Sequence, residues 1–105
     1  MDEHIVLLTT IGSKEEADIL SRGLVEKKLA YCVNVIPSIQ STYFWENKLC
    51  VDEELLLLIK TQEKNFAKVE SWIRKNHSYD IPELIALPIV KGSNDYLQCI
   101  NNWVK

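Results

Sequence analysis

The segment HSYDIPEL, residues 77–84, groups more chemically capable side chains than any other stretch of the chain. His77 can bind a metal ion or carry a proton near neutral pH, and Asp80 and Glu83 can act as hard ligands or as acids. The same residues suit a simple turn, because a histidine at a helix end favours the helix dipole and Pro82 stops the helix from continuing. The spacing matches no recognised zinc or calcium pattern, so the residues alone favour the turn.

Cysteine, lysine and further acids provide weaker candidates. Cys32 offers a thiol that could act as a soft ligand or a nucleophile, although a cysteine in such a position is more often a small buried hydrophobe. Lys60 precedes a predicted helix start, where it could meet an anion, although a surface lysine is the ordinary interpretation. The acids of residues 52–54 could polarise a substrate, but acids that flank a buried strand usually lie in solvent.

Four aromatic side chains could line a pocket, although packing in a core or an interface is their more common role. They are Tyr43, Trp45, Tyr96 and Trp103. No glycine-rich phosphate loop, GxSxG elbow or triad signature accompanies them. An enzyme that uses Cys32 and His77 is a weak hypothesis, because the sequence supplies no third group to orient the pair.

The chain begins with patterns typical of a strand followed by a helix. Residues 4–11 form a compact apolar run rich in β-branched side chains, as expected for a strand. Ser13 and Glu16 have the spacing of a capping box, in which each side chain can satisfy a free backbone N–H at the helix start. Apolar residues then recur on one helical face, so we expect the helix to run to about Ala30.

A long hairpin is predicted next. Residues 31–45 alternate between apolar and polar side chains, as in a strand, and Pro37 within them indicates an edge strand or a bulge. Residues 46–48 suit the turn, because Asn47 tolerates a positive φ. Residues 49–60 form the returning strand, whose second half is apolar on both faces.

The second half of the chain predicts a helix, a strand and a final helix. Thr61 can cap the first of these helices, which should end near His77. Residues 84–90 are a strand candidate, and Pro88 again indicates an edge. Ser93 then caps a short C-terminal helix.

This order of elements predicts an α+β fold, a ferredoxin-like βαββαβ sandwich with an extra C-terminal helix and the strand order 4-1-3-2. The sequence agrees with that order. The two strands that would be central have continuous apolar runs, and the two that would be edges carry the prolines.

The two central strands are apolar on both sides. Helices cover only one face of a ferredoxin-like sheet, so the opposite face would expose a large apolar patch. The C-terminal helix could fold across it, but about ten residues are too few to cover four strands. A sister subunit is the expected cover, and the long hairpin could pair with a neighbour's sheet edge.

Composition narrows the classes of function. A chain of 105 residues suits a single domain, residues 1–105, and 47% hydrophobic residues can support a core. The net charge of −3, with no run of Lys or Arg, argues against a nucleic-acid partner. No apolar stretch approaches the roughly 20 residues that span a bilayer, and the acidic start does not resemble a secretory signal. We therefore expect a cytoplasmic protein without a membrane partner, whose three cysteines are free thiols.

Four segments resemble the CutA family of divalent-cation-tolerance proteins. AYCVNVIPSIQSTYFWENKL is similar to the family signature, a small residue followed by C-x-N-x-x-P and a later S-x-Y-x-W. ELLLLIKT resembles its acidic-apolar strand, HSYDIPELIALPI its H-P-Y-x-x-P-E segment, and YLQCINNW its closing Y-L-x-W-I helix. The correspondence runs over nearly the whole chain, with the segments in the right order.

The resemblance implies a ferredoxin-like subunit in a tight homotrimer, similar to the PII signalling proteins, and a link to metal-ion tolerance through a divalent cation, copper especially or zinc. Copper ligands assigned in part of the family include a cysteine at the end of the first strand and two adjacent histidines. Here the first position reads as Thr9 and the histidine pair reads as Asn76 and His77. Because copper selectivity needs several soft or imidazole ligands, His77 would need Glu83 of a neighbour, or two further copies of itself.

The sequence therefore predicts a non-enzymatic homotrimer that binds a metal ion or small ligand in clefts between subunits. His77 and Glu83 are the predicted metal residues, and Cys32, Lys60 and Tyr96 are weaker candidates for a ligand cleft. The alternative is a stable trimeric scaffold that anchors a protein partner and has no ligand chemistry.

Overall fold

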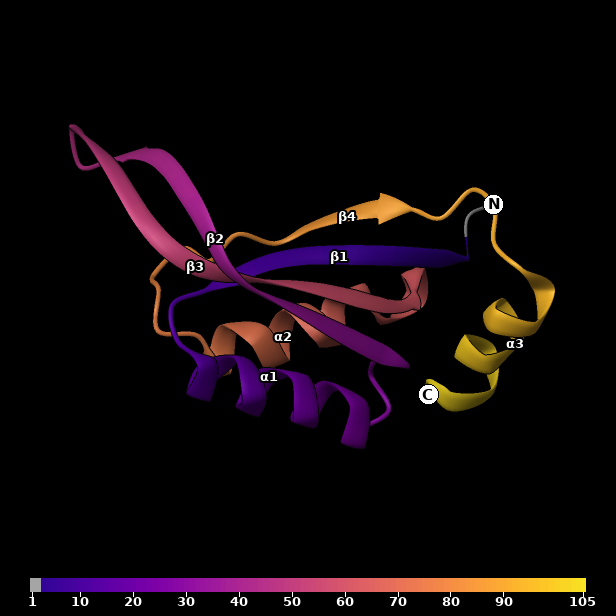
Figure 1. Ribbon diagram of the computed structural model, residues 1–105. Coiled ribbons are helices and arrows are strands. Elements are labelled where there is room, and N and C mark those ends of the chain that lie inside the picture. The colour runs from indigo at the N-terminus through magenta and orange to yellow at the C-terminus, as the bar shows by residue number, and fades with distance from the viewer. Residues whose placement is uncertain (1–2) are drawn as a thin grey trace.

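A four-stranded antiparallel sheet organises residues 3–105, the part of the chain that the structure, a computed structural model, describes. The elements follow one another as predicted, and the strand order β2-β3-β1-β4 confirms the ferredoxin-like arrangement (Figure 1). Along the chain they are β1 (His4–Ile11), α1 (Lys14–Glu26), β2 (Cys32–Trp45), β3 (Lys48–Gln62), a 3-10 turn (Glu63–Asn65), α2 (Phe66–Asn76), β4 (Ile85–Pro88) and α3 (Asn94–Trp103).

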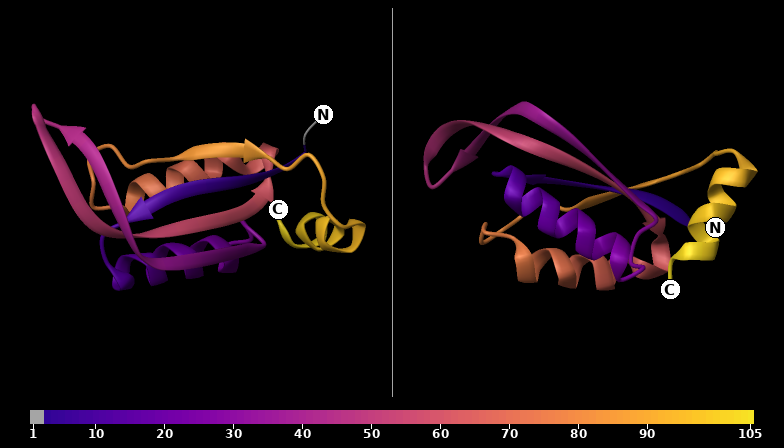
Figure 2. Two further views of the ribbon diagram at one scale, coloured as in Figure 1. Left: turned by 45° about the horizontal axis from the view of Figure 1, so that its top comes forward. Right: turned by 60° about the horizontal axis from the view of Figure 1, so that its bottom comes forward.

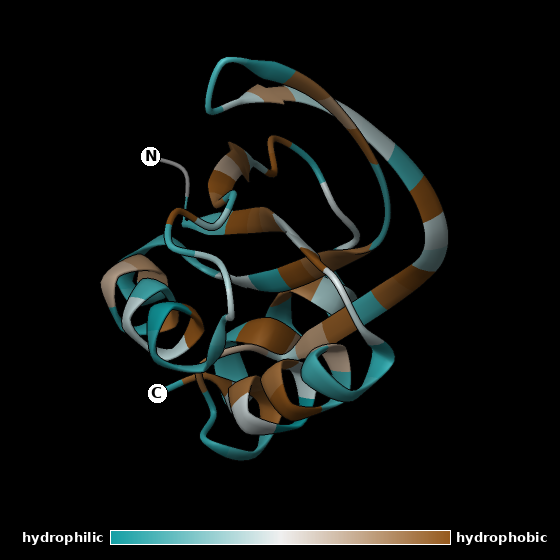
Figure 3. Cartoon of the chain, turned by 90° about the vertical axis from the view of Figure 1, so that its left-hand side faces the viewer, coloured by the Kyte–Doolittle hydropathy of each residue, from teal (hydrophilic) through white to brown (hydrophobic). Residues whose placement is uncertain are grey.

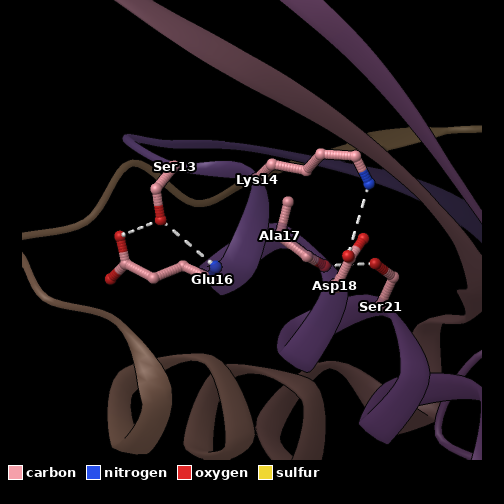
Figure 4. Close-up of polar contacts among 6 residues, drawn as sticks. All are labelled: Ser13, Lys14, Glu16, Ala17, Asp18 and Ser21. Carbon is pink, nitrogen blue, oxygen red and sulfur yellow. Dashed lines mark hydrogen bonds and ion pairs between the residues drawn. The ribbon is translucent and has the colours of Figure 1, made fainter.

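The start of α1 confirms the Ser13 half of the predicted capping box, but the Glu16 carboxylate accepts from the Ser13 hydroxyl rather than from the Ser13 backbone N–H. The Glu16 backbone N–H donates to Ser13 Oγ at 3.2 Å, and the Ser13 hydroxyl in turn donates to the Glu16 carboxylate at 3.2 Å (Figure 4). One turn later, Lys14 pairs with Asp18 at 3.3 Å. These contacts satisfy a backbone donor that the first turn of a helix would otherwise leave free.

The end of α1 corrects the predicted boundary, because the helix stops at Glu26 rather than near Ala30. The Leu29 N–H donates to the Leu24 carbonyl at 2.9 Å, and the Lys28 N–H donates to the Val25 carbonyl at 3.0 Å. Lys28 adopts a φ of 60° to make this reversal. Glycine is the residue that usually marks such a stop, so the lysine concealed it in the sequence.

The hairpin of β2 and β3 is paired almost throughout its length and reaches well beyond the rest of the sheet. Its pairing slips between Ile36 and Ile39, where Ser38 has a φ of 61°, so the bulge that Pro37 predicted is confirmed. At the tip, Glu46 and Asn47 both have positive φ, as a tight two-residue turn requires. The hairpin gives the molecule its longest dimension, 44 Å.

The predicted cap at Thr61 is wrong. Thr61 lies inside β3 and is fully buried, and its hydroxyl donates to the Leu29 carbonyl at 2.6 Å. The strand continues to Gln62, and a 3-10 turn separates it from α2. Thr61 instead satisfies a carbonyl of the segment between α1 and β2, which also accepts from Asn65 Nδ2 at 3.2 Å. The predicted last strand is also shorter, since only Ile85–Pro88 pairs.

The two faces of the sheet differ in what covers them. Helices α1 and α2 lie side by side on one face and bury the side chains that β1 and β3 direct toward them, including Leu7 and Ile59 (Figure 2). Strand register places a second apolar set on the other side, which we call the open face. Its members are Val6, Leu8, Leu56, Leu58, Ile85 and Leu87. Apolar bands also continue along the hairpin (Figure 3).

Helix α3 does not cover the open face. It lies beyond the end of the sheet, where Asn101 Oδ1 accepts hydrogen bonds from His4 Nε2 at 2.8 Å and from Gln62 Nε2 at 2.6 Å. The fully buried Ile100 anchors it. The alternative in which the C-terminal helix folds across the open face is therefore wrong. No helix of residues 3–105 combines the length and the apolar character that a membrane crossing needs.

Close contact between α1 and α2 depends on Gly23. A Cβ atom at this position would lie 2.1 Å from Cζ2 of Trp72. The indole is held in place, because Trp72 Nε1 donates to the Leu20 carbonyl at 3.3 Å and Lys27 Nζ lies 5.0 Å from the ring centroid. The glycine therefore makes room for the tryptophan rather than providing a special backbone conformation.

Gly23→Ala should destabilise the protein although alanine is the better helix former. The propensity gain of about 1 kcal/mol is outweighed by overpacking against Trp72, which costs roughly 1–3 kcal/mol and more at so short a distance. Denaturant unfolding at one protein concentration measures the difference. Ser21→Ala in the same helix is the control and should change stability by less than about 0.5 kcal/mol. A stabilised Gly23→Ala variant would show that Trp72 moves freely.

Candidate functional site

A cavity of about 650 Å³ lies between the long hairpin and the loop that joins α2 to β4. This volume is in the usual range of small-molecule sites. The walls combine hydroxyl, aromatic and acidic side chains. They are Thr10, Ser41, Thr42, Tyr43, Trp45, Glu54, Ser78, Tyr79, Asp80, Ile81, Pro82 and Glu83. Most of the HSYDIPEL segment therefore lines this cavity, and its interpretation as a turn is confirmed because residues 77–84 form no helix or strand.

Glu54 is the buried acid of the cavity, with only 5% of its surface exposed. Tyr79 Oη donates a hydrogen bond of 2.6 Å to its carboxylate. Burial, followed by this hydrogen bond, raises the pKa of Tyr79 above its ordinary value, so the phenol stays a donor. Gly12 lets the ring approach, since a Cβ there would lie 3.2 Å from Tyr79 Oη.

The burial of Glu54 corrects the expectation that the acids of residues 52–54 lie in solvent. Asp52 and Glu53 are exposed, but Glu54 is covered. One feature of the sequence indicates the burial of Glu54. Glu54 continues the alternation of Leu56 and Leu58 on β3, so its side chain faces the same side of the sheet. Which residue covers it could not be found from sequence, because Tyr79 is 25 positions away.

Two aromatic side chains of the hairpin, Tyr43 and Trp45, line the cavity. For these two, the prediction that the aromatic residues could line a pocket is confirmed. Tyr43 Oη donates to the Asp52 carboxylate across the hairpin. That hydrogen bond, followed by burial, raises the pKa of Tyr43 to about 12. Trp45 stands on the same wall with 42% of its surface exposed. Both rings are therefore available to a ligand.

His77 lies beside the cavity, at the end of α2, rather than in its wall. Its Nε2 lies 2.7 Å from the Thr10 carbonyl, which can only accept, and its Nδ1 lies 3.1 Å from the Tyr79 backbone N–H, which can only donate. The proton therefore sits on Nε2, and Nδ1 carries the lone pair. The bond to Thr10 ties the loop to β1, and the bond to Tyr79 lies within the loop.

The metal candidates do not form a complete ligand set within one chain. His77 and Glu83 belong to one loop, and of the two only Glu83 lines the cavity. Across residues 3–105, no group of three or more His, Cys, Asp or Glu side chains is arranged to hold a metal ion. Copper or zinc bound by protein ligands alone requires more donors than these two.

The three weaker cleft candidates are brought together, at the other end of the sheet. Cys32 and Lys60 are cross-strand partners on β2 and β3, and both contact the side-chain oxygen of Asn34, the thiol at 3.9 Å. Tyr96 approaches them from α3 and stacks edge-on against Tyr31, with 5.6 Å between ring centroids. Burial, followed by contact with the Cys32 thiol, raises the pKa of Tyr96 to about 12.

The two groups of candidates are separate. His77 bonds to Thr10 of β1, whereas Lys60 of β3 pairs with Val6, which lies four residues earlier on β1. Four residues of a strand span about 13 Å. One ligand of ordinary size therefore does not contact both groups within one chain.

Comparisons with known proteins agree with the family resemblance of the sequence. The sequence model of the family described as CutA1 divalent ion tolerance protein matches residues 5–103. "Protein CutA, chloroplastic" of Arabidopsis thaliana is 43% identical over 98 residues, which make up 93% of this chain and 54% of that protein. The chain thus spans about half the length of this plant relative.

A bacterial relative and a solved plant structure match over more of their length. The "Divalent-cation tolerance protein CutA" of Thermus thermophilus is 42% identical over 92 residues, 88% of this chain and 89% of that protein. The crystal structure of CutA1 from Oryza sativa superposes with a TM-score of 0.96 at 40% identity, covering 99% of this chain and 95% of that chain. The match extends over the sheet, the hairpin and all three helices.

Tyr79→Phe should destabilise the protein, because it removes the donor from a buried carboxylate and leaves the ring in place. The expected loss is about 1–3 kcal/mol, measured by denaturant unfolding. Tyr43→Phe is the matched control, since it removes a phenol from the exposed Asp52 and should have a much smaller effect. Equal losses in the two variants would contradict the importance of the Glu54 contact.

Proposed function

Because the chain belongs to the CutA1 divalent ion tolerance protein family, we propose that it is a non-enzymatic homotrimer that binds a divalent cation in clefts between subunits and acts in metal-ion tolerance. Residues 1–105 would form a single domain that is the unit of assembly. We further propose a cytoplasmic location, in which the free thiols of Cys32, Cys50 and Cys99 would stay reduced. The relatives' names describe tolerance of divalent cations rather than a reaction.

The apolar side chains of the open face support the proposal of an oligomer. Helices α1 and α2 lie on the opposite face, α3 lies beyond the end, and yet the central strands direct leucine and valine side chains outward. The hairpin adds large exposed apolar residues near its tip, with Phe44 68% and Leu49 70% exposed. Such surfaces in one molecule typically mark an interface. Three copies are proposed because the family resemblance implies PII-like trimers.

The hydrogen bonds of His77 support its proposed role as a ligand. Histidines that bind metals commonly donate their second ring N–H to a backbone carbonyl, which fixes the ring and directs the other nitrogen at the ion. His77 already has this arrangement, with Nε2 bound to the Thr10 carbonyl. Its Nδ1 is held only by one backbone N–H at 3.1 Å, which an ion could displace. Glu83 supplies a carboxylate from the same loop.

A neighbouring subunit would have to complete this ligand set, because one chain supplies only an imidazole and a carboxylate. When bound, copper or zinc would bring these groups of different chains together, while the chain's own residues orient the ring and the loop. Cys32, Lys60 and Tyr96 are proposed as a second and weaker ligand position, since they converge at the other end of the sheet.

A second candidate function is a trimeric scaffold that anchors a protein partner. It is favoured by one observation, that residues 3–105 hold no complete metal-binding group within one chain. The two functions share the trimer and differ in ion affinity. Metal titration of a chelator-treated sample therefore separates them.

Leu58→Lys should dissociate the assembly. Leu58 lies opposite Leu8 at the centre of the open face, and a charge there would be buried against a neighbouring subunit. Light scattering should report a mass of about three chains for the wild type and one chain for the variant. Ile19→Lys is the control, since Ile19 is an exposed apolar residue on the outside of α1. A wild type of one-chain mass would contradict the proposed trimer.

His77→Ala should weaken the binding of Cu(II) and Zn(II) by about tenfold or more without changing the mass. Titration calorimetry measures the affinity. His4→Ala is the matched control, because His4 is the only other histidine and bonds to Asn101 far from the cavity. Wild-type affinity in His77→Ala would remove His77 from the site, and a wild type with no affinity would favour the scaffold.

A further inference from the structure

We propose that the cavity beneath the hairpin binds a small organic ammonium ion, whose positive charge pairs with Glu54, a buried carboxylate that has no ion-pair partner among residues 3–105. This ligand class differs from a divalent metal ion, and the proposal does not use His77. Because Glu54 lies on the same side of β3 as Leu56 and Leu58, the cavity borders the open face that the proposed trimer would bury, so the assembled protein is the one to test. The proposal is based on three features of the cavity: an unpaired buried carboxylate, aromatic walls, and acids too dispersed to meet at one metal ion.

Glu54 is a buried acid without a cationic partner among the residues that the structure describes. Only two ion pairs occur within residues 3–105, Lys14 with Asp18 and Arg74 with Glu70, and both lie on helices. The single hydrogen bond from Tyr79 satisfies part of the carboxylate and provides no positive charge. A buried carboxylate that has no counterion is unfavourable, so a cation that enters the cavity would gain a strong partner.

The aromatic rings provide the second feature. Tyr43, Trp45 and Tyr79 all line the cavity and come from the hairpin and from the loop. The faces of such rings are electronegative, and aromatic walls combined with carboxylates are a common way to bind ammonium groups. No lysine or arginine is among the lining residues of the described chain. The cavity therefore offers a cation both negative charge and ring faces, without a competing positive side chain.

The size of the cavity and the spacing of its acids favour an organic ion over a metal ion. Asp80 and Glu83 lie on the loop and Glu54 lies on β3, and together they do not form a group that could hold a metal ion. A cavity of about 650 Å³ is also far larger than a bare ion needs. An alkyl diammonium ion fits both facts, because its apolar body contacts rings while its two charged ends reach separate carboxylates.

Putrescine, an alkyl diamine, is the probe for this proposal, and the uncharged butanediol of similar length is its control. Titration calorimetry on the full, assembled protein should show saturable binding of putrescine with a dissociation constant of about a millimolar or tighter, and no binding of the diol. Absence of putrescine binding to the assembled protein would overturn the proposal, including the case in which a neighbouring copy's own side chain fills the cavity.

Glu54→Gln tests the role of the buried charge. The amide keeps the size of the side chain and an oxygen that accepts from Tyr79, so the affinity for putrescine should fall about tenfold or more while the fold is kept. Glu53→Gln is the matched control, because Glu53 is the adjacent, exposed acid of the same strand and does not line the cavity. Equal affinities of the two variants would overturn the proposal.

Trp45→Leu provides a second route if Glu54→Gln fails to fold, since Trp45 is partly exposed and lies in the wall. Loss of this ring should weaken putrescine binding several-fold, and unchanged binding would contradict the role of the aromatic walls. A protein that binds putrescine but no Cu(II) contradicts only the divalent-cation proposal. A protein that binds Cu(II) but no putrescine contradicts only this one.

Discussion

The two-sided apolar character of β1 and β3 is the constraint on which the rest of the structure depends. Leu7 and Ile59 point into the layer of α1 and α2, while Leu8 and Leu58, one residue away on each strand, point to the open face. Alternation along a strand makes this unavoidable once both positions are leucine, isoleucine or valine. The layer of α1 and α2 covers one face of the sheet only. The short α3 lies at the end of the sheet and does not cover the open face.

Contacts of its own side chains with the sheet fix the loop of residues 77–84. His77 holds it to the Thr10 carbonyl, and Tyr79 holds it to the buried Glu54. The cavity exists because the hairpin extends past these anchors and supplies a second wall, which includes Tyr43 and Trp45.

Local patterns predicted most elements, and the errors have physical causes. The Ser13 cap, the Pro37 bulge and the Asn47 turn were predicted because each depends on residues within a few positions. The sequence does not reveal the end of α1, because Lys28 occupies a left-handed position that glycine usually takes. The Thr61 hydroxyl suits a helix cap, but in the fold it satisfies the Leu29 carbonyl, 32 positions earlier.

The order of the elements, the strand order and the second apolar face can be predicted from the sequence, because they follow from periodicity, prolines and local caps. The HSYDIPEL segment can also be recognised there as a concentration of reactive groups. How those groups are used depends on the folded structure. It assigned the His77 ring nitrogens to two backbone partners, buried Glu54 under Tyr79, and separated Cys32, Lys60 and Tyr96 from the cavity. Each of these depends on contacts between residues distant in the chain, and such contacts are set by the packing of strands and loops rather than by local sequence.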